Sequence, residues 1–220
     1  MKSILVLIDA GHGSLDWEGK YVTPGKRSPS AHSPIIYEGV VNRAQSNLLN
    51  YMLSLAGIRS TIIAPENNDV GINTRVNRVN TCVSNERSKG NDCFGISIHS
   101  NYAGTEQNPI VAASGWEVFT SSGTNDSDKI AALFAEEMRK SGLFNIRKGE
   151  GGDDKDTDKL GMLNYTRCPF ILTEDGFMSN IGIGGDFDKL CDMSWICNMV
   201  DYKVEAIKRV LKEHYKINAI

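Results

Sequence analysis

The chain has 220 residues, of which 40% are hydrophobic and 23% are charged. This composition is typical of a globular protein and excludes disordered and collagen-like chains. The length allows one sizeable core but is too short for two ordinary catalytic domains. The net charge of -3 gives no attraction of the whole chain to nucleic acid or to an anionic membrane, and no apolar run approaches the ~20 residues of a membrane helix.

The first predicted element is a buried strand over residues 4–8. The start of the chain has some features of a signal peptide, but Asp9 ends the apolar stretch and no small-residue cleavage site follows. We therefore predict a strand and no signal peptide. A chain of this kind is expected to stay in the cytoplasm until something releases it.

A long loop over residues 14–37, rich in proline, glycine and serine, follows the first strand. The rest of the chain alternates between apolar runs typical of strands and helical periodicity. Strands are predicted over residues 59–64, 94–98, 116–120 and 170–173, and helices over residues 38–56, 71–87, 126–141 and 195–214. This alternation predicts an α/β fold in a single domain, with a mostly parallel sheet and helices on both faces.

Three chemically capable residues fall at the carboxyl ends of predicted strands, where ligands bind in open α/β sheets. His12 follows the first strand between two glycines, His99 ends the strand 94–98, and Glu174 ends the strand 170–173. The flanking glycines allow a sharp turn and leave the imidazole of His12 accessible. The other two histidines are predicted to be surface residues: His32 in the long loop, for which an approach to the site is the alternative, and His214 in the charged last helix.

Glu38 stands at the start of a predicted helix, where the helix dipole favours a carboxylate. Together with His12 and His99 it would form a catalytic zinc site, in which a water takes the fourth position and loses a proton near neutral pH. Glu174 is the predicted general base and acid. Asp175 ranks second because neighbouring residues of a strand point to opposite faces.

The chain has five cysteines and no CxxC pair: Cys82, Cys93, Cys168, Cys191 and Cys197. An odd number without paired spacing argues against a zinc ribbon and against a disulfide-stapled secreted domain. We expect reduced, mostly buried thiols and synthesis in a reducing cytosol.

Several segments taken together resemble the zinc-dependent N-acetylmuramoyl-L-alanine amidases of the amidase-3 type. The resemblance covers about residues 4–212 and is carried by residues 7–13, Glu38 with Asn42, Arg75 and Arg78 with Asn80, residues 96–101 and residues 172–180. The order and spacing of these segments are specific, although each segment alone is not. The segment before Glu38 is longer than is usual in that family and holds a second acid, Glu18. Glu38 is preferred because Asn42 and a helical pattern follow it.

The resemblance implies one zinc ion per chain on His12, Glu38 and His99, with catalysis by Glu174 through a zinc-bound water. It implies hydrolysis of the amide between the N-acetylmuramoyl group and the first L-alanine of the peptidoglycan stem peptide, and a mixed, mostly parallel sheet of about six strands. Substrate contacts are predicted for Asn101, Arg75 and Asp175, although the resemblance also suggests a structural polar role for Arg75.

The whole chain, residues 1–220, is expected to be one catalytic amidase domain without a separate wall-binding domain. These expectations describe a phage-type endolysin that acts as a monomer on peptidoglycan, without nucleic acid and without stable membrane association. Two alternatives stay open. A zinc peptidase could use the same ligands to cut within the stem peptide, and a wall-binding protein without catalytic activity could share the fold.

Two loops add secondary signals. Trp17, Tyr21 and Tyr37 in the first loop could contact sugar or peptide, or could anchor the loop. In residues 149–160, Asp154, Asp156 and Asp158 have the spacing of a calcium loop. Lys159 stands where the turn glycine is needed, and Tyr165 stands where the bidentate glutamate is needed. We therefore expect a solvated loop that helps to shape a substrate cleft.

Overall fold

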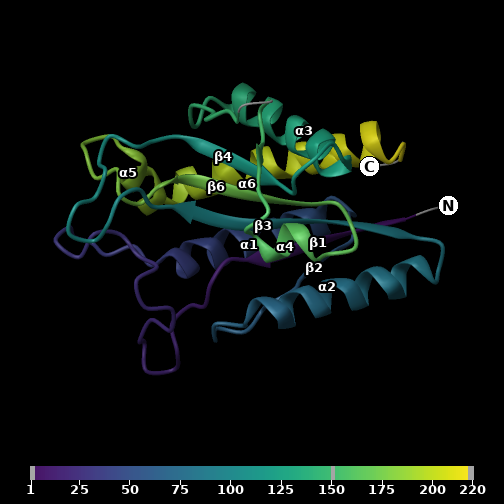
Figure 1. The fold of residues 1–220 in the computed structure, drawn as a ribbon, viewed down its shortest axis with the longest axis horizontal. Helices are drawn as coiled ribbons and strands as arrows, with labels where there is room; N and C mark the ends of the chain where they lie inside the picture. Colours follow the sequence, from purple (N-terminus) through teal and green to yellow (C-terminus); the bar gives the residue numbers. More distant parts are fainter. Residues whose placement is uncertain (1–2, 150–151, 218–220) are drawn as a thin grey trace.

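One six-stranded sheet forms the centre of the computed structural model, which describes residues 3–149 and 152–217 (Figure 1). The strand order is β2-β1-β3-β6-β4-β5. The strands are β1 (Ile4–Ala10), β2 (Ser60–Ile62), β3 (Asp92–Asn101), β4 (Trp116–Thr120), β5 (Lys155–Asp156) and β6 (Phe170–Phe177). Strands β2, β1, β3 and β6 are parallel, whereas β4 pairs antiparallel with β6 and parallel with β5. The prediction of a mixed, mostly parallel sheet of about six strands is confirmed.

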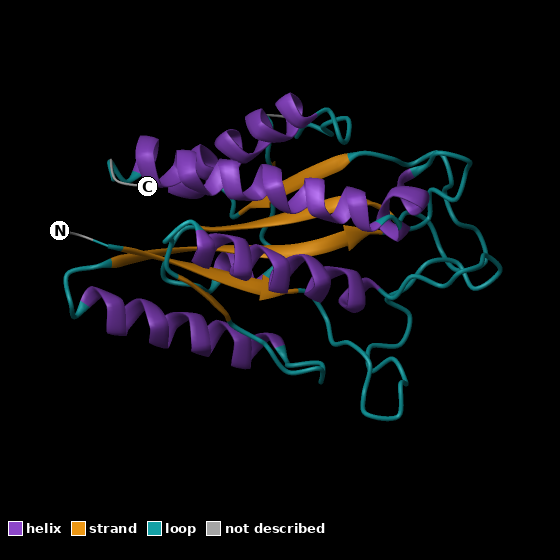
Figure 2. Cartoon of the chain, turned by 180° about the vertical axis from the view of Figure 1, so that it is seen from behind, coloured by secondary structure: helices purple, strands orange, loops and turns teal. Residues whose placement is uncertain are grey.

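Helices cover both faces of the sheet (Figure 2). They are α1 (Glu38–Leu55), α2 (Ile72–Arg87), α3 (Asp126–Ser141), α4 (Gly161–Asn164), α5 (Asp186–Cys191) and α6 (Met193–Arg209), which continues into the π-helical turn η1 (Val210–His214). Helices α1, α3 and α6 pack on one face and enclose the larger hydrophobic core, whereas α2 and α4 cover the other face and a smaller core.

The alternation of side chains along the strands decides which residues reach each face. In β3, Ile96 and Ile98 belong to the larger core. His99 therefore points to the face that carries α2 and α4. In β6, Ile171 lies in the larger core and Leu172 in the smaller one, which places Glu174 on the same face as His99. The period of two thus sends both polar side chains to one face.

Several elements differ from the sequence prediction. Strands β3 and β6 extend beyond residues 94–98 and 170–173, because their polar ends still pair in the ladder although they interrupt the apolar run. Strand β5 and helices α4 and α5 were not predicted, since elements of two to six residues carry no readable periodicity. The last helix begins at Met193, where the side chain of Asp192 caps it by accepting a hydrogen bond from the backbone N–H of Ser194 (2.8 Å).

The prediction of mostly buried thiols is wrong, although all five cysteines are free. Cys93 and Cys168 are buried and Cys82 is half-buried, but Cys191 and Cys197 are exposed. Cys191 ends α5 at an exposed turn, and Cys197 lies on the solvent side of the first part of α6. Within the part of the chain that the structure describes, no helix is long and apolar enough to cross a membrane.

Candidate active site

The carboxyl end of β1 leads into a sharply turned backbone at His12. This residue has φ of 63°, in the left-handed region that residues other than glycine rarely adopt. The Arg75 side chain donates a hydrogen bond to the carbonyl oxygen of His12 (3.0 Å) and another to that of Ala10 (2.6 Å). Gly11 passes so close to His99 that a Cβ atom there would lie 2.3 Å from the imidazole. The turn thus brings the two histidines together.

Helix α1 begins with Glu38, whose side chain points toward both histidines. The first turn of the helix packs directly against the turn after β1, since a Cβ atom on Gly39 would lie 1.7 Å from the carbonyl oxygen of Gly13. Glu38 is only 4% exposed. This contact between two backbone segments fixes where the carboxylate sits relative to His12.

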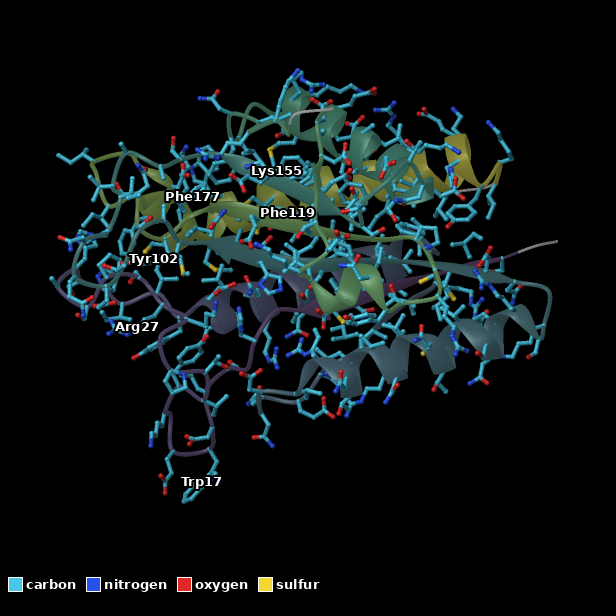
Figure 3. The ribbon with its side chains drawn as sticks, in the orientation of Figure 1. Trp17, Arg27, Tyr102, Phe119, Lys155 and Phe177 are labelled. Atoms are coloured by element: carbon cyan, nitrogen blue, oxygen red, sulfur yellow. The ribbon has the colours of Figure 1, made fainter. Side chains whose placement is uncertain are left out.

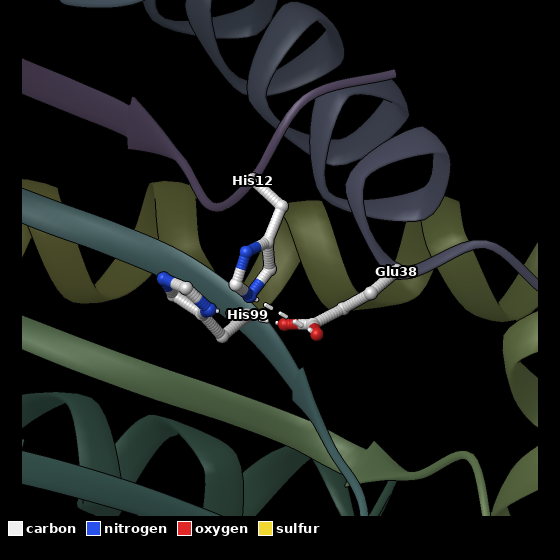
Figure 4. A group of neighbouring side chains, drawn as sticks. All are labelled: His12, Glu38 and His99. Atoms are coloured by element: carbon white, nitrogen blue, oxygen red, sulfur yellow. Dashed lines mark hydrogen bonds and ion pairs between the residues drawn. The ribbon is translucent and has the colours of Figure 1, made fainter. Parts of the chain in front are cut away.

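The three side chains form a tight cluster (Figure 4). The Nε2 atom of His12 lies 3.1 Å from one carboxylate oxygen of Glu38, and the Nδ1 atom of His99 lies 3.0 Å from the other. Their potential ligand atoms all lie within 4.8 Å of one another. Two imidazole nitrogens and one carboxylate that face a common point fit the donor set of a catalytic zinc site.

The charges of the cluster are strongly coupled. Burial alone raises the pKa of Glu38, but hydrogen bonds from His12 and His99 outweigh it and hold the pKa well below its usual range. For His99, burial lowers the pKa, but the facing Glu38 carboxylate raises it by more, so that the net shift is upward. A negative carboxylate is therefore buried between two bases, which is an environment suited to a cation.

Neighbouring polar groups hold Glu38 in place. The backbone N–H of Ser100 donates to one of its carboxylate oxygens at 3.4 Å. The Asn42 side-chain amide contacts the same oxygen at 3.5 Å and donates to the carbonyl oxygen of Gly11 at 3.2 Å. Asn42 is fully buried and Ser100 is 2% exposed. These contacts orient the carboxylate as the outer shell of a metal site does.

Arg75 has a structural position behind His12. It is 4% exposed, and its guanidinium pairs with Asp9 at 2.6 Å and donates to the carbonyl oxygen of Val70 at 2.7 Å. Asp9 also accepts a hydrogen bond from the Ser97 hydroxyl at 2.6 Å. The guanidinium thus holds the backbone that carries His12, which is the structural polar role that the resemblance suggested.

Glu174 lies beside His99 on the neighbouring strand. The register of the parallel pair β3–β6 places His99 opposite Glu174. The Oε2 atom of Glu174 is buried and has no hydrogen-bond partner among the described residues. Burial raises the pKa of Glu174 to about 8, against the opposing effect of His99 and with further contributions from Glu38, Asp175 and Glu117. Such a carboxyl can hold a proton near neutral pH.

Glu117 is a site residue that the sequence analysis did not identify. It lies on β4 directly opposite Glu174 and is 4% exposed. Arg147 and Lys155 both pair with it, the latter at 2.9 Å, and the Asn101 side chain donates to it at 3.3 Å. The sequence does show a glutamate within an otherwise apolar predicted strand, which could have marked Glu117 as unusual. Only the register of the β4–β6 pair shows that its neighbour is Glu174.

Aromatic rings accompany these cations. The Arg147 guanidinium lies 5.0 Å from the ring centre of Phe177, and the Lys155 ammonium lies 5.7 Å from that of Phe119. Figure 3 shows Phe177, Phe119 and Lys155 along β6, β4 and β5. Arg147 and Lys155 therefore place two positive charges beside the Glu117 carboxylate of β4.

Asp175 points away from Glu174, into the larger core. It is fully buried and pairs with the Lys203 ammonium at 2.7 Å. Its other oxygen accepts hydrogen bonds from the Trp116 indole N–H at 3.0 Å and from the Tyr202 hydroxyl at 3.2 Å. This carboxylate contacts only protein groups and lies on the opposite side of the sheet from the histidines.

A cavity of about 390 Å³ opens beside the cluster of His12, Glu38 and His99. It is lined by His12 and His99, by the charged residues Asp9, Asp69 and Arg75, and on one side by apolar residues, among them Ile72, Met162 and Leu172. The cavity lies on the face of the sheet that α2 and α4 cover, which is the face that carries Glu174. It offers space for an apolar part of a ligand next to the two imidazoles.

The remaining histidines and Glu18 lie outside the cluster. His32 is half-buried, with its ring 4.4 Å from that of Phe187, and His214 is half-buried with its ring 4.6 Å from that of Tyr215. Both were predicted to be surface residues. Glu18 is exposed at the tip of a hairpin in the first loop, whereas Glu38 points toward both histidines.

A second acidic group lies in the loop that resembles a calcium site in sequence. Asp154 and Asp156 approach Asp128 of α3, and their potential ligand atoms lie within 4.8 Å of one another. The Thr120 hydroxyl lies 2.7 Å from Asp154 and 3.2 Å from Asp156. A larger cavity, of about 640 Å³, adjoins this group. Asp158 is not a member, and residues 150–151 of this loop lie outside the described residues.

Comparisons with known proteins point to one group. The family Amidase_3, described as N-acetylmuramoyl-L-alanine amidase, matches residues 6–209. The fold is similar to that of an N-acetylmuramoyl-L-alanine amidase from Clostridium difficile 630, with a TM-score of 0.74, 19% identity and coverage of 97% of this chain and 99% of that one. No curated protein sequence matches significantly.

Two further solved structures share the fold. The catalytic domain of CwlV, an N-acetylmuramoyl-L-alanine amidase from Bacillus (Paenibacillus) polymyxa var. colistinus, has a TM-score of 0.70 and 18% identity over 99% of this chain and 100% of that one. The catalytic domain of the CD27L endolysin, which targets Clostridia difficile, has a TM-score of 0.59 and 19% identity over 93% of this chain and 97% of that one.

Proposed function

Because this chain belongs to the Amidase_3 family of N-acetylmuramoyl-L-alanine amidases, we propose that it cleaves peptidoglycan with a single zinc ion held by His12, Glu38 and His99. The observation that carries the proposal is the cluster in which both imidazoles face the buried Glu38 carboxylate, at 3.1 and 3.0 Å. When bound, zinc would acidify a water molecule and polarise the amide carbonyl.

Within this proposal, Glu174 moves the proton. Its carboxyl lies next to His99, and its buried Oε2 has no protein partner among the described residues. In its deprotonated form, which a bound cation would favour, this carboxylate can accept a proton from water, and in its protonated form it can return the proton to the leaving group. Hydrolysis breaks the amide C–N bond. The hydroxyl of the water joins the carbonyl carbon of the muramoyl lactyl group, and the proton passes through Glu174 to the alanine nitrogen.

The other proposed site residues support this chemistry. Arg75 holds the strained backbone at His12, and Asn101 reaches Glu117 beside Glu174. Asp175 stabilises the strand from its far side through Lys203. Direct contact with substrate is favoured for Asn101, which is half-buried. Arg75 and Asp175 are 4% and 0% exposed, which leaves them little surface for a ligand.

The biological setting is part of the same proposal. The chain would act as a monomeric, single catalytic domain of the endolysin type that reaches peptidoglycan after release from the cytoplasm. Two alternatives, a zinc peptidase of the stem peptide and a wall-binding protein without activity, predict different products. The unpaired Glu174 oxygen beside a complete ligand set favours catalysis over binding alone.

Digestion of purified peptidoglycan tests the proposed bond. We expect the wild-type protein to release new L-alanine amino termini, to lose this activity with a zinc chelator, and to regain it with added zinc. New amino termini of any other stem-peptide residue would establish the peptidase instead. No new termini from zinc-loaded protein would establish the binding protein.

Three variants test the roles of single residues. Glu174→Gln is expected to lower activity by about 10²–10⁴-fold while one zinc ion per chain stays bound. Glu38→Gln is expected to lose the zinc, whereas the matched control Glu18→Gln, at an exposed acid in the loop before α1, keeps it. Full activity of Glu174→Gln, or full zinc content of Glu38→Gln, would contradict the assignment.

A further inference from the structure

The long loop after His12 begins with a short, well-ordered hairpin over residues 14–22. The backbone N–H of Val22 donates to the carbonyl oxygen of Ser14 at 3.0 Å, and Leu15 pairs with Tyr21. At the tip, the Asp16 side chain accepts hydrogen bonds from the backbone N–H groups of Glu18 and Lys20, at 3.0 and 2.8 Å. Its tip is therefore held in one conformation by its own hydrogen bonds.

The base of this hairpin is fixed to the metal centre. The rings of Tyr21 and Tyr37 stack with their centres 4.5 Å apart, and the Tyr21 hydroxyl accepts a hydrogen bond from the backbone N–H of Gly39 (3.0 Å). The backbone N–H of Gly13 donates to the Thr23 hydroxyl at 2.9 Å. Two of the three aromatic residues in this loop thus anchor the hairpin beside Glu38.

The third aromatic residue has the opposite environment. Trp17 is 90% exposed and lies at the tip of the hairpin, which projects from the sheet edge that carries the histidines (Figure 3). The other two tryptophans are packed: Trp116 is fully buried, and Trp195 lies against Phe144 with ring centres 5.8 Å apart. The hydrogen bonds of the hairpin hold this ring in solvent, where it adds nothing to the hydrophobic core. A single exposed apolar side chain is ordinary on a protein surface, but a ring presented at the tip of a hairpin in this way is available for contact with a ligand.

We propose that Trp17 is an auxiliary contact for the glycan strand of peptidoglycan, where its indole ring stacks on a sugar ring of the same polymer that is cut at the metal centre. This inference rests on the proposed function. The face of an aromatic ring is electron-rich and attracts the partly positive C–H edges of a pyranose. Three residues of extended chain place the tip roughly 10 Å beyond Gly13, so a polymer can reach both positions.

The chemistry of the tip favours a sugar over an anionic membrane. Asp16 and Glu18 flank the ring and outnumber the single cation, Lys20, so the tip carries a net negative charge that an anionic lipid surface would repel. A neutral sugar ring meets no such repulsion, and acidic side chains can accept hydrogen bonds from its hydroxyls.

Binding of the full-length protein to glycan strands freed of stem peptides tests the proposal. We compare Glu174→Gln protein with and without Trp17→Ala, and measure the fraction of protein retained by the glycan strands, which are immobilised on beads, and the change in tryptophan emission. We expect Trp17→Ala to weaken retention about tenfold, Trp17→Phe to restore much of it, and the emission of the parent protein to shift to shorter wavelength. Leu55→Ala, which removes a 66% exposed side chain of α1, is the matched control.

A second measurement separates this inference from the proposed function. With Glu174 intact, Trp17→Ala is expected to lower hydrolysis of intact peptidoglycan but not of a small soluble N-acetylmuramoyl-L-alanyl peptide. A wild-type protein that fails on both substrates refutes the proposed function, whereas glycan retention can still be measured. Unchanged retention of Trp17→Ala overturns the inference, as does a Trp17-dependent binding to lipid vesicles or a Trp17-dependent dimer in place of glycan binding.

Discussion

At the scale of single residues, the site depends on the two residues that follow β1, Gly11 and His12. Gly11 has no side chain because the His99 imidazole occupies that space, and His12 adopts a left-handed backbone that Arg75 stabilises through the carbonyl oxygen. Strain of this kind persists only where the surrounding structure holds it, and it is concentrated at functional sites. The absence of a side chain at Gly11 therefore makes room for the His99 ring, a proposed metal ligand.

Substitution of Gly11 by alanine tests this close approach. A Cβ atom at this position would lie 2.3 to 2.6 Å from three atoms of the His99 ring, so the ring must move away from Glu38. We expect zinc affinity to fall by about 10–100-fold, since displacement of a ligand costs at least as much as loss of its outer-shell support. Competition with a chelating dye measures the affinity.

The control for this variant is Gly182→Ala, at a glycine with no neighbour within 4 Å of the added Cβ atom, which is expected to bind zinc normally. Circular dichroism follows the fold, because overpacking of this kind costs about 1–3 kcal/mol and leaves most domains folded. Wild-type zinc affinity in folded Gly11→Ala protein would show that the ring can move without loss of the site.

The sequence predicts those site residues that lie near the carboxyl ends of strands, but not those whose position depends on tertiary packing. His12 follows β1, and His99 and Glu174 lie in the carboxyl-terminal halves of β3 and β6, which are parallel in the sheet, so the fold prediction alone brings them toward one end of the sheet. Glu38 needs the packing of α1 against Gly13, which no local pattern reveals. Glu117 becomes a neighbour of Glu174 only because β4 is antiparallel to β6, and sequence periodicity carries no information on strand direction.

At the scale of elements, the predictions succeeded for long periodic segments and failed for short ones. Helices α1, α2 and α3 begin and end within two residues of their predicted limits, because an apolar stripe and a clear stop define them. Strand β5 has two residues and exists only as a partner of β4. Such an element forms only because its backbone pairs with a strand that is distant in the sequence, so its own residues do not predict it.

One link between elements joins the start of β2 to the end of α2. Arg59 donates two hydrogen bonds to the Glu86 carboxylate, at 2.8 and 3.0 Å, and Asn91 adds a third at 3.0 Å. These contacts lower the pKa of Glu86 from 4.5 to about 2, with the hydrogen bond from Arg59 as the largest cause. The glutamate therefore stabilises the fold as a carboxylate.

The pH dependence of this link has a definite sign. A carboxyl whose pKa is lowered in the folded state stabilises the protein above its ordinary pKa and loses that contribution as the pH falls through the lowered value. We expect Glu86→Gln to be less stable than wild type at pH 7, and the difference to shrink between about pH 4.5 and pH 2. Urea unfolding across this range measures it.

The control for Glu86→Gln is the same substitution at a carboxyl that does not contact Arg59. Glu205→Gln removes an exposed partner of Lys208 on α6 and is expected to change stability by no more than about 0.5 kcal/mol. A gap between wild type and Glu86→Gln that stays constant down to pH 2 would show that the cost comes from lost packing, since packing does not titrate.

At the scale of the whole molecule, a buried ion pair on one face of the sheet links α6, near the end of the chain, to β6 and α1. Lys203 of α6 contacts Asp175 of β6 at 2.7 Å and the Gln45 side chain of α1 at 2.9 Å, inside the larger core. Lys203 and Asp175 are fully buried. The link also fixes β6 next to Glu174, on the face opposite the proposed metal centre, so the core and the site share one strand.

Removal of one charge from this pair is expected to lower the free energy of unfolding more than removal of both charges. Lys203→Met keeps most of the side-chain volume but leaves the Asp175 carboxylate buried without its cation, and the loss of one partner of a buried pair costs about 3–5 kcal/mol. In the double variant with Asp175→Asn no charge is left unpaired, so we expect much of this stability to return. Urea unfolding at neutral pH gives the free energies, and Lys208→Met, at an exposed pair of the same helix, is the control.

The double variant decides between two accounts of the same loss. If the buried charge is the cause, Trp116 and Tyr202 can still donate to the amide oxygen that replaces a carboxylate oxygen of Asp175, and the core closes around a neutral group. If the double variant is as unstable as Lys203→Met, the cost lies in the packing of the lysine stem between α6 and α1. The pair would then act as a spacer in the core, and its charge would contribute nothing to the stability of the molecule.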